Sequence, residues 1–188
     1  MAPPLRRGAN VALTKEVPNL KGVVLGFQWD AGSDSSLARN LVAAVILCGA
    51  DGSALSDEHF VFFNQLTSPD LSVIQLEEAL GDDDEQIEVD LVHVPPAVDR
   101  MAVVLYINDG SPAKRTLAQL RSCRVRVLHI ETKAELTRSE ELSEALSNET
   151  ALILAELYRH QTGWKFRVVG QGFAKGVADI GSVYGLTW

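Results

Sequence analysis

The sequence LVAAVILC, at Leu41–Cys48, is the longest uninterrupted apolar run in this chain of 188 residues. It has the length of a β-strand, whereas a membrane-spanning helix needs roughly 20 apolar residues. The run is followed by Gly49-Ala50-Asp51-Gly52, and Asp-Gly is a strong signal for a tight turn between strands. The segment therefore predicts a strand that ends in a turn, and it predicts no direct insertion into a membrane.

Other segments carry the same kind of signal. Met101–Ile107 (MAVVLYI) is apolar throughout, which is typical of a central strand. Gln86–Leu91 (QIEVDL) and Arg124–Ile130 (RVRVLHI) alternate polar and apolar residues, which predicts half-buried strands with Arg124 and Arg126 pointing outward. The remaining strand-like segments are Asn10–Thr14, Gly22–Trp29, Phe60–Asn64 and a hairpin of Ala151–His160 with Trp164–Val169, turning at Gln161-Thr162-Gly163.

Helical signals are few. Ser111–Arg121 has Ser111 as a cap and Pro112 at the first helical position, and Gly176–Tyr184 has room for a turn or two of helix. There is no alternation of strands with helices and no internal repeat. The pattern predicts an all-β fold: a two-sheet β-sandwich of short, mainly antiparallel strands with one or two short helices, forming a single domain over residues 1–188.

Composition narrows the class of protein. The apolar fraction of 46% is ordinary for a globular chain with a real core. The N-terminus has charge but lacks the apolar segment of a secretion signal. Cys48 and Cys123 lie in strand-like segments, so we expect buried free thiols. The acidic balance argues against a nucleic-acid partner. We expect a soluble, cytoplasmic protein.

The net charge is concentrated in one window, Glu77–Asp90, which holds eight carboxylates and no lysine or arginine. The chain has 25 acidic and 17 basic residues, so removing these eight leaves 17 against 17 and no net charge. At its centre, Asp82-Asp83-Asp84-Glu85 follows the flexible Gly81. Neighbouring like charges repel unless water, salt or a cation screens them. The window is either a solvated loop, which patterning alone favours, or half of a site for a hard cation such as Ca²⁺.

Several blocks, in order along the chain, resemble the TerD family of tellurium-resistance and stress-response proteins. The most specific block lies near the C-terminus, where Glu156-Leu-Tyr-Arg-His160 is followed by Trp164–Ala174 (WKFRVVGQGFA). The resemblance extends from Leu5 to about Gly176. The other matching blocks are Leu5–Gly8 with Val11–Lys15, Val23–Asp30, Gly49–Gly52 with Asp57 and Phe60–Gln65, Ser68–Asp70 with Ser72-Val73, and Asp83–Glu85 with Ile87, Val89–Leu91 and Val94-Pro95.

The resemblance implies a β-sandwich that binds Ca²⁺ through acidic loops gathered at one end of its sheets. It also implies a protein that is not an enzyme and that acts in tellurite or chemical stress. The expected partners are other TerD-family proteins or a membrane partner of the tellurite-resistance system. The residues that match the family's ligand positions, or stand beside them, are Asp82, Asp83, Asp84, Glu85, Asp109, Asp30, Asn40 and Asn64.

One ligand loop departs from the family pattern. Where the family has Asp-Leu-Asp, this chain has Asn40-Leu41-Val42, so two charges are lost, and Arg39 adds a positive one. Because Ca²⁺ affinity depends on the number of charged ligands, Asn40 and Val42 are expected to weaken the site. Two functions therefore remain open: a calcium-binding stress-response module acting through protein assembly, or a metal-free scaffold protein of the same fold.

Enzymatic motifs are missing from the sequence. The four histidines have no metal-ligand spacing, and no Gly-x-Ser-x-Gly elbow is present. The glycines of Gly170–Gly176 have only twelve residues after them, too few for the strand–helix–strand unit of a dinucleotide site. We expect these glycines to form a tight turn, and we expect no catalytic activity.

Overall fold

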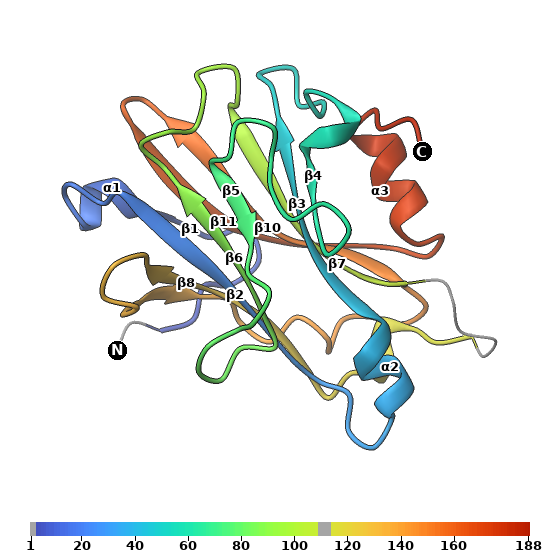
Figure 1. The fold of residues 1–188 in the computed structure, drawn as a ribbon. Coiled ribbons are helices and arrows are strands. Elements are labelled where there is room, and N and C mark those ends of the chain that lie inside the picture. Colours follow the sequence, from blue (N-terminus) through green and yellow to red (C-terminus); the bar gives the residue numbers. More distant parts are fainter. Residues whose placement is uncertain (1–2, 109–113) are drawn as a thin grey trace.

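The computed structural model describes residues 3–108 and 114–188, which form two stacked antiparallel sheets (Figure 1). The predicted two-sheet β-sandwich is confirmed. The six-stranded sheet has the order β1-β11-β10-β7-β3-β4, with β1 Asn10–Ala12, β11 Gly163–Phe173, β10 Ala151–His160, β7 Arg100–Ile107, β3 Leu41–Cys48 and β4 Phe60–Val61. The five-stranded sheet has the order β5-β6-β2-β8-β9, with β5 Val73–Gln75, β6 Glu85–Asp90, β2 Gly22–Asp30, β8 Ser122–His129 and β9 Glu135–Arg138.

The central strands of the six-stranded sheet are buried on both faces, which explains their continuous apolar sequences. One side of β3, which includes Val45 and Leu47, packs between the two sheets in the main core. The other side, which includes Ala44 and Ile46, joins a second apolar cluster on the outer face of the sheet. The short helix α3 (Val177–Val183) covers that outer face, and its Ile180 is fully buried there (Figure 1).

The five-stranded sheet has one apolar face, and its sequences alternate accordingly. On β6, Ile87 and Val89 are buried in the main core, while Glu88 between them is half-buried on the other side. On β8, Val125 and Val127 enter the core, and Arg126 lies on the outer face as predicted. The acidic loop that precedes β6 lies against this outer face.

Some local predictions differ from the structure. The strand predicted over Asn10–Thr14 ends at Ala12, where a single helical turn, α1 (Leu13–Glu16), begins. The strand predicted over Phe60–Asn64 is reduced to the two residues of β4. A helix that was not predicted, α2 (Ser35–Asn40), is capped by Asp34, whose side chain accepts a hydrogen bond of 3.0 Å from Leu37 N. Two short 3₁₀ turns complete the elements: η1 (Asp57–His59) and η2 (Leu117–Gln119).

The two predicted helices have different outcomes. The helix predicted over Gly176–Tyr184 is confirmed as α3. The start of the other prediction, with Ser111 and Pro112, lies outside the described residues, and the part from 114 to 121 contains only η2. In the described part of the chain, none of the helices has the length and apolar character that crossing a bilayer requires.

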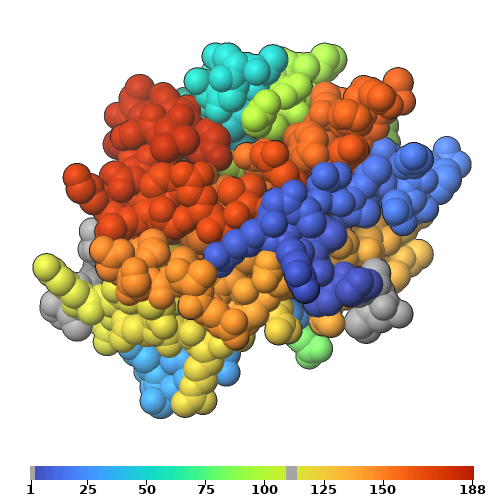
Figure 2. Space-filling view, turned by 180° about the vertical axis from the view of Figure 1, so that it is seen from behind, coloured from blue at the N-terminus to red at the C-terminus, as the bar shows by residue number. Residues whose placement is uncertain are grey.

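The ends of the chain close two edges of the sandwich. The segment around Leu5 forms a parallel bridge with Ser139, next to β9, before β1 joins β11 in the other sheet. Figure 2 shows this N-terminal segment, in blue, lying across the back of the molecule. At the far end, Ala54 N donates to Tyr184 O, so the C-terminal segment rests beside the loop after β3. In Figure 2 this is the contact of the red and cyan surfaces.

Candidate cation-binding loop

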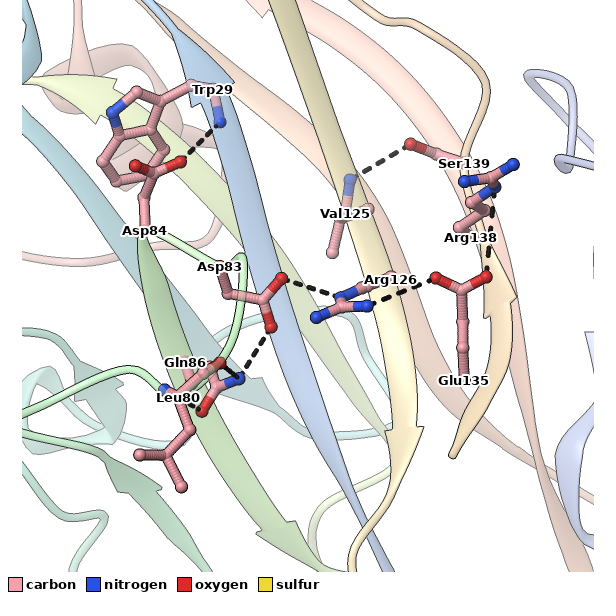
Figure 3. Close-up of polar contacts among 10 residues, drawn as sticks. All are labelled: Trp29, Leu80, Asp83, Asp84, Gln86, Val125, Arg126, Glu135, Arg138 and Ser139. Carbon is pink, nitrogen blue, oxygen red and sulfur yellow. Dashed lines mark hydrogen bonds and ion pairs between the residues drawn. The ribbon is translucent and has the colours of Figure 1, made fainter. Parts of the chain in front are cut away.

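Asp83 anchors the acidic loop to the outer face of the five-stranded sheet. Its side chain is 0% exposed. Its Oδ1 accepts a hydrogen bond of 2.7 Å from Arg126 Nε on β8, and its Oδ2 accepts one of 2.7 Å from Gln86 Nε2 on β6 (Figure 3). The Gln86 amide group also exchanges two hydrogen bonds with the backbone of Leu80. Protein donors thus engage both oxygens of this buried carboxylate, as a buried charge requires.

Gly26, in the middle of β2, leaves the space that the Asp83 carboxylate occupies. A Cβ atom at position 26 would lie 2.3 Å from Asp83 Oδ2. Arg126, which pairs with Asp83, also faces Glu135 on β9, with 3.5 Å between Arg126 Nη1 and Glu135 Oε1. Glu135 in turn lies 4.0 Å from Arg138 Nε (Figure 3). The loop is therefore held by a row of alternating charges, and Asp83 belongs to that row.

Asp84 lies at the end of β2, away from this row. Its Oδ2 accepts a hydrogen bond of 2.8 Å from Trp29 N (Figure 3). Burial raises the pKa of the Asp84 carboxyl, and the nearby charges of Asp83 and Asp30 raise it further. Asp30 is exposed, and its Oδ1 accepts a hydrogen bond of 2.8 Å from Gly32 N. Asp84 and Asp30, predicted as ligands from distant parts of the sequence, are thus close enough to repel one another.

Glu85 reaches into the gap between the two sheets. Its Oε2 accepts a hydrogen bond of 2.9 Å from Gln75 Nε2, and the Ala43 N–H on β3 also donates to it. Burial raises the pKa of the Glu85 carboxyl despite these donors. Gln75 is 6% exposed, and its Oε1 has no hydrogen-bond partner among the described residues. A cavity of about 480 Å³ opens at this point, lined by Phe63, Leu66, Gln75, Leu76, Glu77, Ala79, Asp84 and Glu85.

Besides Asp30 and Asp84, two more of the predicted ligands are exposed. Asp82 is exposed at the tip of the acidic loop. Asn64 is also exposed, in a tight turn that is closed by two backbone hydrogen bonds of 3.0 Å between Phe62 and Gln65. Each presents its oxygen to solvent, and neither lines the cavity beside Glu85.

The loop with the altered ligand pattern lies at the end of α2. Asn40 Nδ2 donates to Ser36 O at 2.8 Å, and Asn40 O accepts a hydrogen bond of 2.7 Å from Asn108 N. This contact brings the position before Asp109 beside Asn40, although Asp109 itself lies outside the described residues. Val42 is 5% exposed and packs in the second apolar cluster on the outer face of the six-stranded sheet.

The predicted ligands therefore divide into separate groups. Asp83 is paired with Arg126, and Glu85 and the exposed Asp84 line the cavity. Asp30, Asp82 and Asn64 are exposed outside it. Within residues 3–108 and 114–188, no three His, Cys, Asp or Glu side chains are arranged to hold a metal ion. The donors that fit a Ca²⁺ ion best are the carboxylates of Asp84 and Glu85 with the partnerless amide oxygen of Gln75, because Ca²⁺ prefers oxygen ligands and completes its shell with water.

Two residues that matter here were not selected from the sequence as parts of a site. The alternation predicts Arg126 only as an outward residue of a strand, and no sequence pattern predicts the short strand β5, which carries Gln75. For Arg126, one sequence feature could have indicated an ion pair: a basic residue alternates with valines in a strand of a protein that has an excess of carboxylates. For Gln75 no local signal exists, because its importance comes from burial beside Glu85.

The two cysteines are buried free thiols, as predicted. Burial raises the pKa of each thiol to about 12. Cys123 lies in the core between the sheets, whereas Cys48 lies in the cluster on the outer face of the six-stranded sheet. They therefore belong to different apolar clusters, and both are in the unreactive thiol form at neutral pH.

The fold and the loop define a class: a two-sheet antiparallel β-sandwich with a conspicuous acidic loop packed on one sheet. The family model of the TerD domain matches residues 1–184. The chain is 37% identical to the tellurium resistance protein TerD of Serratia marcescens, over 99% of this chain and 98% of that protein. It is 38% identical to general stress protein 16U of Bacillus subtilis, over 97% and 96% of the two chains. The chain belongs to the TerD family of tellurium-resistance and stress-response proteins.

Solved structures show the same fold. A crystal structure of a protein of unknown function superposes with a TM-score of 0.69 at 20% identity, covering 90% of this chain and 99% of that one. A homologue of the telluride resistance protein from Streptomyces coelicolor A3(2) superposes with a TM-score of 0.61 at 23% identity, covering 82% and 91%. At these identities the likeness supports the fold alone.

Proposed function

We propose that this TerD-family protein acts in tellurite or chemical stress as a calcium-binding module that works through assembly with other proteins and catalyses no reaction. The relatives from Serratia marcescens and Bacillus subtilis, named for tellurium resistance and general stress, support the stress role. A further relative, from Clostridium acetobutylicum, is named a chemical-damaging agent resistance protein and is 33% identical over 70% of this chain.

The observation that carries the calcium proposal is the partnerless Gln75 Oε1, which lines the same cavity as the half-buried carboxylate of Glu85 and the exposed carboxylate of Asp84. Burial raises the pKa of both Asp84 and Glu85, so each carboxylate lacks enough favourable partners for its charge. A bound cation would provide such a partner. With two charged ligands and one neutral ligand, the site would depend on water for the rest of its shell, and we expect weak binding, with a Kd of about 10⁻⁴ to 10⁻³ M.

Calorimetric titration of Ca²⁺ into EDTA-treated protein tests this proposal. The expected result is binding by the native protein, a loss of at least tenfold in affinity for Glu85→Gln, and no change for Asp82→Asn. The second substitution removes a charge from the same acidic run but outside the cavity. Ca²⁺ should also raise the melting temperature of the native protein, because a ligand of the folded state stabilises it. If the native protein neither releases heat nor changes its melting temperature, the calcium proposal fails.

The alternative is a metal-free scaffold of the same fold, and one contact favours it. Asp83, a residue of the acidic loop that matches the family pattern, is fully occupied by Arg126 and Gln86. On this alternative the loop is a structural element held by protein donors alone. Equal melting temperatures in Ca²⁺ and in EDTA, for the native protein and Glu85→Gln alike, would support the scaffold and contradict the calcium module.

The proposed partners are other TerD-family proteins or a membrane partner of the tellurite-resistance system. The edge strand β5 supports an assembly role, because Ile74 on this strand is 37% exposed and Leu71 just before it is 66% exposed. Sedimentation of this chain mixed with a second TerD-family protein measures the association. We expect Ile74→Lys with Leu71→Lys to weaken it, while Val92→Lys, on another loop with an exposed apolar residue, leaves it unchanged.

A further inference from the structure

A second cavity lies on the outer face of the six-stranded sheet, where β4, the start of α3 and the C-terminal segment meet (Figure 1). Its volume is about 460 Å³, within the range of small-molecule sites. Four of its lining residues are aromatic: Phe60, Phe62, Tyr106 and Trp188. The calcium proposal does not use this cavity, which is lined by none of the residues assigned to that site.

The four rings are inclined to one another. The centroid of Phe60 lies 4.9 Å from that of Phe62, 5.1 Å from that of Trp188 and 6.4 Å from that of Tyr106. The corresponding angles between ring planes are 69°, 74° and 48°. The rings therefore form walls at an angle to each other, in contrast to a flat stack. Phe60 and Tyr106 are buried, while Trp188 is 51% exposed at the entrance.

Two carboxylates stand beside the rings. Asp57 and Glu58 of η1 line the cavity, together with Gln65 and Val177. Its described lining includes no lysine, arginine or histidine. Asp57 also accepts a hydrogen bond of 3.0 Å from Thr187 N, which fastens the segment that carries Trp188. The cavity thus combines aromatic walls with negative charge.

Both carboxylates are ionised at neutral pH. Hydrogen bonds from the Thr187 hydroxyl and backbone N–H lower the pKa of the Asp57 carboxyl. A hydrogen bond with Ser56 lowers the pKa of the Glu58 carboxyl. Since both groups are exposed, their charges act on whatever enters the cavity and are partly screened by water and salt.

A neighbouring cavity is lined by basic residues, so the acidic lining is a feature of the first cavity and is not shared by the cavity beside it. It shares Tyr106 and Val177 with the first cavity, and its described lining includes Lys114, Arg115 and Lys175 but no carboxylate. The charged residues that line the two cavities are therefore of opposite sign, although Arg115 also pairs with Asp34 at 2.9 Å.

We propose that the cavity lined by Phe60, Phe62, Tyr106 and Trp188 binds a small organic cation of the alkylammonium class. The faces of aromatic rings attract cations through their quadrupole, and the attraction is strongest where the cation leaves water. An alkylated ammonium group fits such a place because its charge is spread over apolar surface. The carboxylates of Asp57 and Glu58 add attraction for a positive charge and oppose anions.

The test compares ligands of one shape and different charge. Choline is titrated into the full chain by calorimetry and by NMR, with its neutral isostere 3,3-dimethyl-1-butanol and the anionic 3,3-dimethylbutanoate as controls. We expect choline to bind roughly three- to thirtyfold more tightly than the neutral isostere, the range typical of a cation on aromatic rings. The anion should not displace choline. Equal binding of choline and the alcohol, or no binding of choline, would overturn the proposal.

Two ring variants and a matched pair of charge variants locate the binding site. Trp188→Leu and Phe62→Leu remove a ring while keeping an apolar side chain, and each should weaken choline binding severalfold. Glu58→Gln should weaken it, whereas Glu144→Gln, which removes the same charge from an exposed position away from the cavity, should not. Each variant is first checked for an unchanged melting temperature. If folded Trp188→Leu and folded Phe62→Leu both bind choline as the native protein does, the cavity is not the site and the proposal is wrong.

Discussion

Asp83 and Glu85 stand two residues apart in the same acidic run, yet they meet opposite surroundings. Asp83 lies on the outer face of the five-stranded sheet and has a guanidinium and an amide donor on its two oxygens. Glu85 points toward the gap between the sheets, where it receives neutral donors and no positive charge. Strand alternation alone would put residues two apart on the same face, but Asp83 lies in the loop before β6, which begins at Glu85. The path of the loop therefore places two carboxylates that look alike in sequence in different electrostatic environments.

The comparison shows that an acidic run is not a single site. One carboxylate holds the loop to the sheet, and its neighbours face a cavity with less compensation for their charge. A cation would be expected only at the cavity beside Glu85 and not at Asp83. The loop's attachment and its proposed calcium binding can therefore be disturbed separately, and the expected effects fall in a definite order.

The largest effect is expected for Asp83→Ala. The Arg126 guanidinium, only 19% exposed, would keep only the weaker contact with Glu135, and Gln86 would lose an acceptor. Removing one partner of a buried ion pair costs about 3 kcal/mol, which corresponds to a drop of roughly 10 °C in melting temperature. Thermal unfolding followed by circular dichroism measures it. In a double-mutant cycle with Arg126→Met, the double variant should lose less free energy of unfolding than the sum of the losses of the two single variants.

A smaller effect is expected for Gly26→Ala. The new methyl group would meet Asp83 Oδ2 at 2.3 Å, so the carboxylate would have to move away from Arg126 and Gln86. We expect a loss of about 1–3 kcal/mol in the free energy of unfolding, measured with urea. The same substitution should cost much less in the Asp83→Ala background, where that carboxylate is gone. An equal cost in both backgrounds would show that Gly26 is needed for another reason.

A third effect concerns pH and tests the environment of Glu85, the second carboxylate of the comparison. Burial raises the pKa of Glu85 in the folded protein, so protonation favours the folded state. This contribution is complete below the unfolded pKa and is lost as the pH rises through the higher folded pKa. In EDTA, Glu85→Gln should therefore gain melting temperature relative to the native protein between pH 4 and pH 7, by roughly 1–3 °C. A difference that stays constant with pH would contradict the assigned environment of Glu85.

The smallest effect is expected for Asp82→Asn. Its side chain is exposed at the tip of the acidic loop, next to Asp83. Surface substitutions of this kind change the free energy of unfolding by less than about 0.5 kcal/mol. Urea unfolding at pH 7 in EDTA measures the change. A loss as large as that of Gly26→Ala would mean that the whole run, and not only Asp83, holds the loop.

Much of the fold follows from the sequence alone. The strands β3 and β10 have the predicted limits, and β7 begins one residue before its predicted start. For β3 and β7 the signal is a continuous apolar run of strand length, which is typical of a strand buried on two faces. The two alternating segments lie largely in β6 and β8, where Glu88 and Arg126 are on the outer face as the period of two requires, whereas Glu85 at the start of β6 points between the sheets. The family was also recognisable from ordered blocks of residues, and the TerD-domain match confirms it.

The short elements were harder to predict. Helix α2 spans six residues and depends on its Asp34 cap, and β5 and β9 have three and four residues. Segments this short carry too few residues for a period to stand out. Tertiary contacts decide them: β5 exists because Val73 pairs with Val89 of β6, and β9 because Thr137 pairs with Val127 of β8.

By itself, the sequence determined that this protein is a β-sandwich with all of its net charge in one acidic window. Only the tertiary structure decided what each carboxylate in that window does. Arg126 lies 43 residues from Asp83, and Gln75 lies 10 residues before Glu85, on another strand. Charge and periodicity are local properties that the sequence displays directly. The state of a carboxylate depends on which donors reach it and how much water remains, and the packing of distant strands sets both.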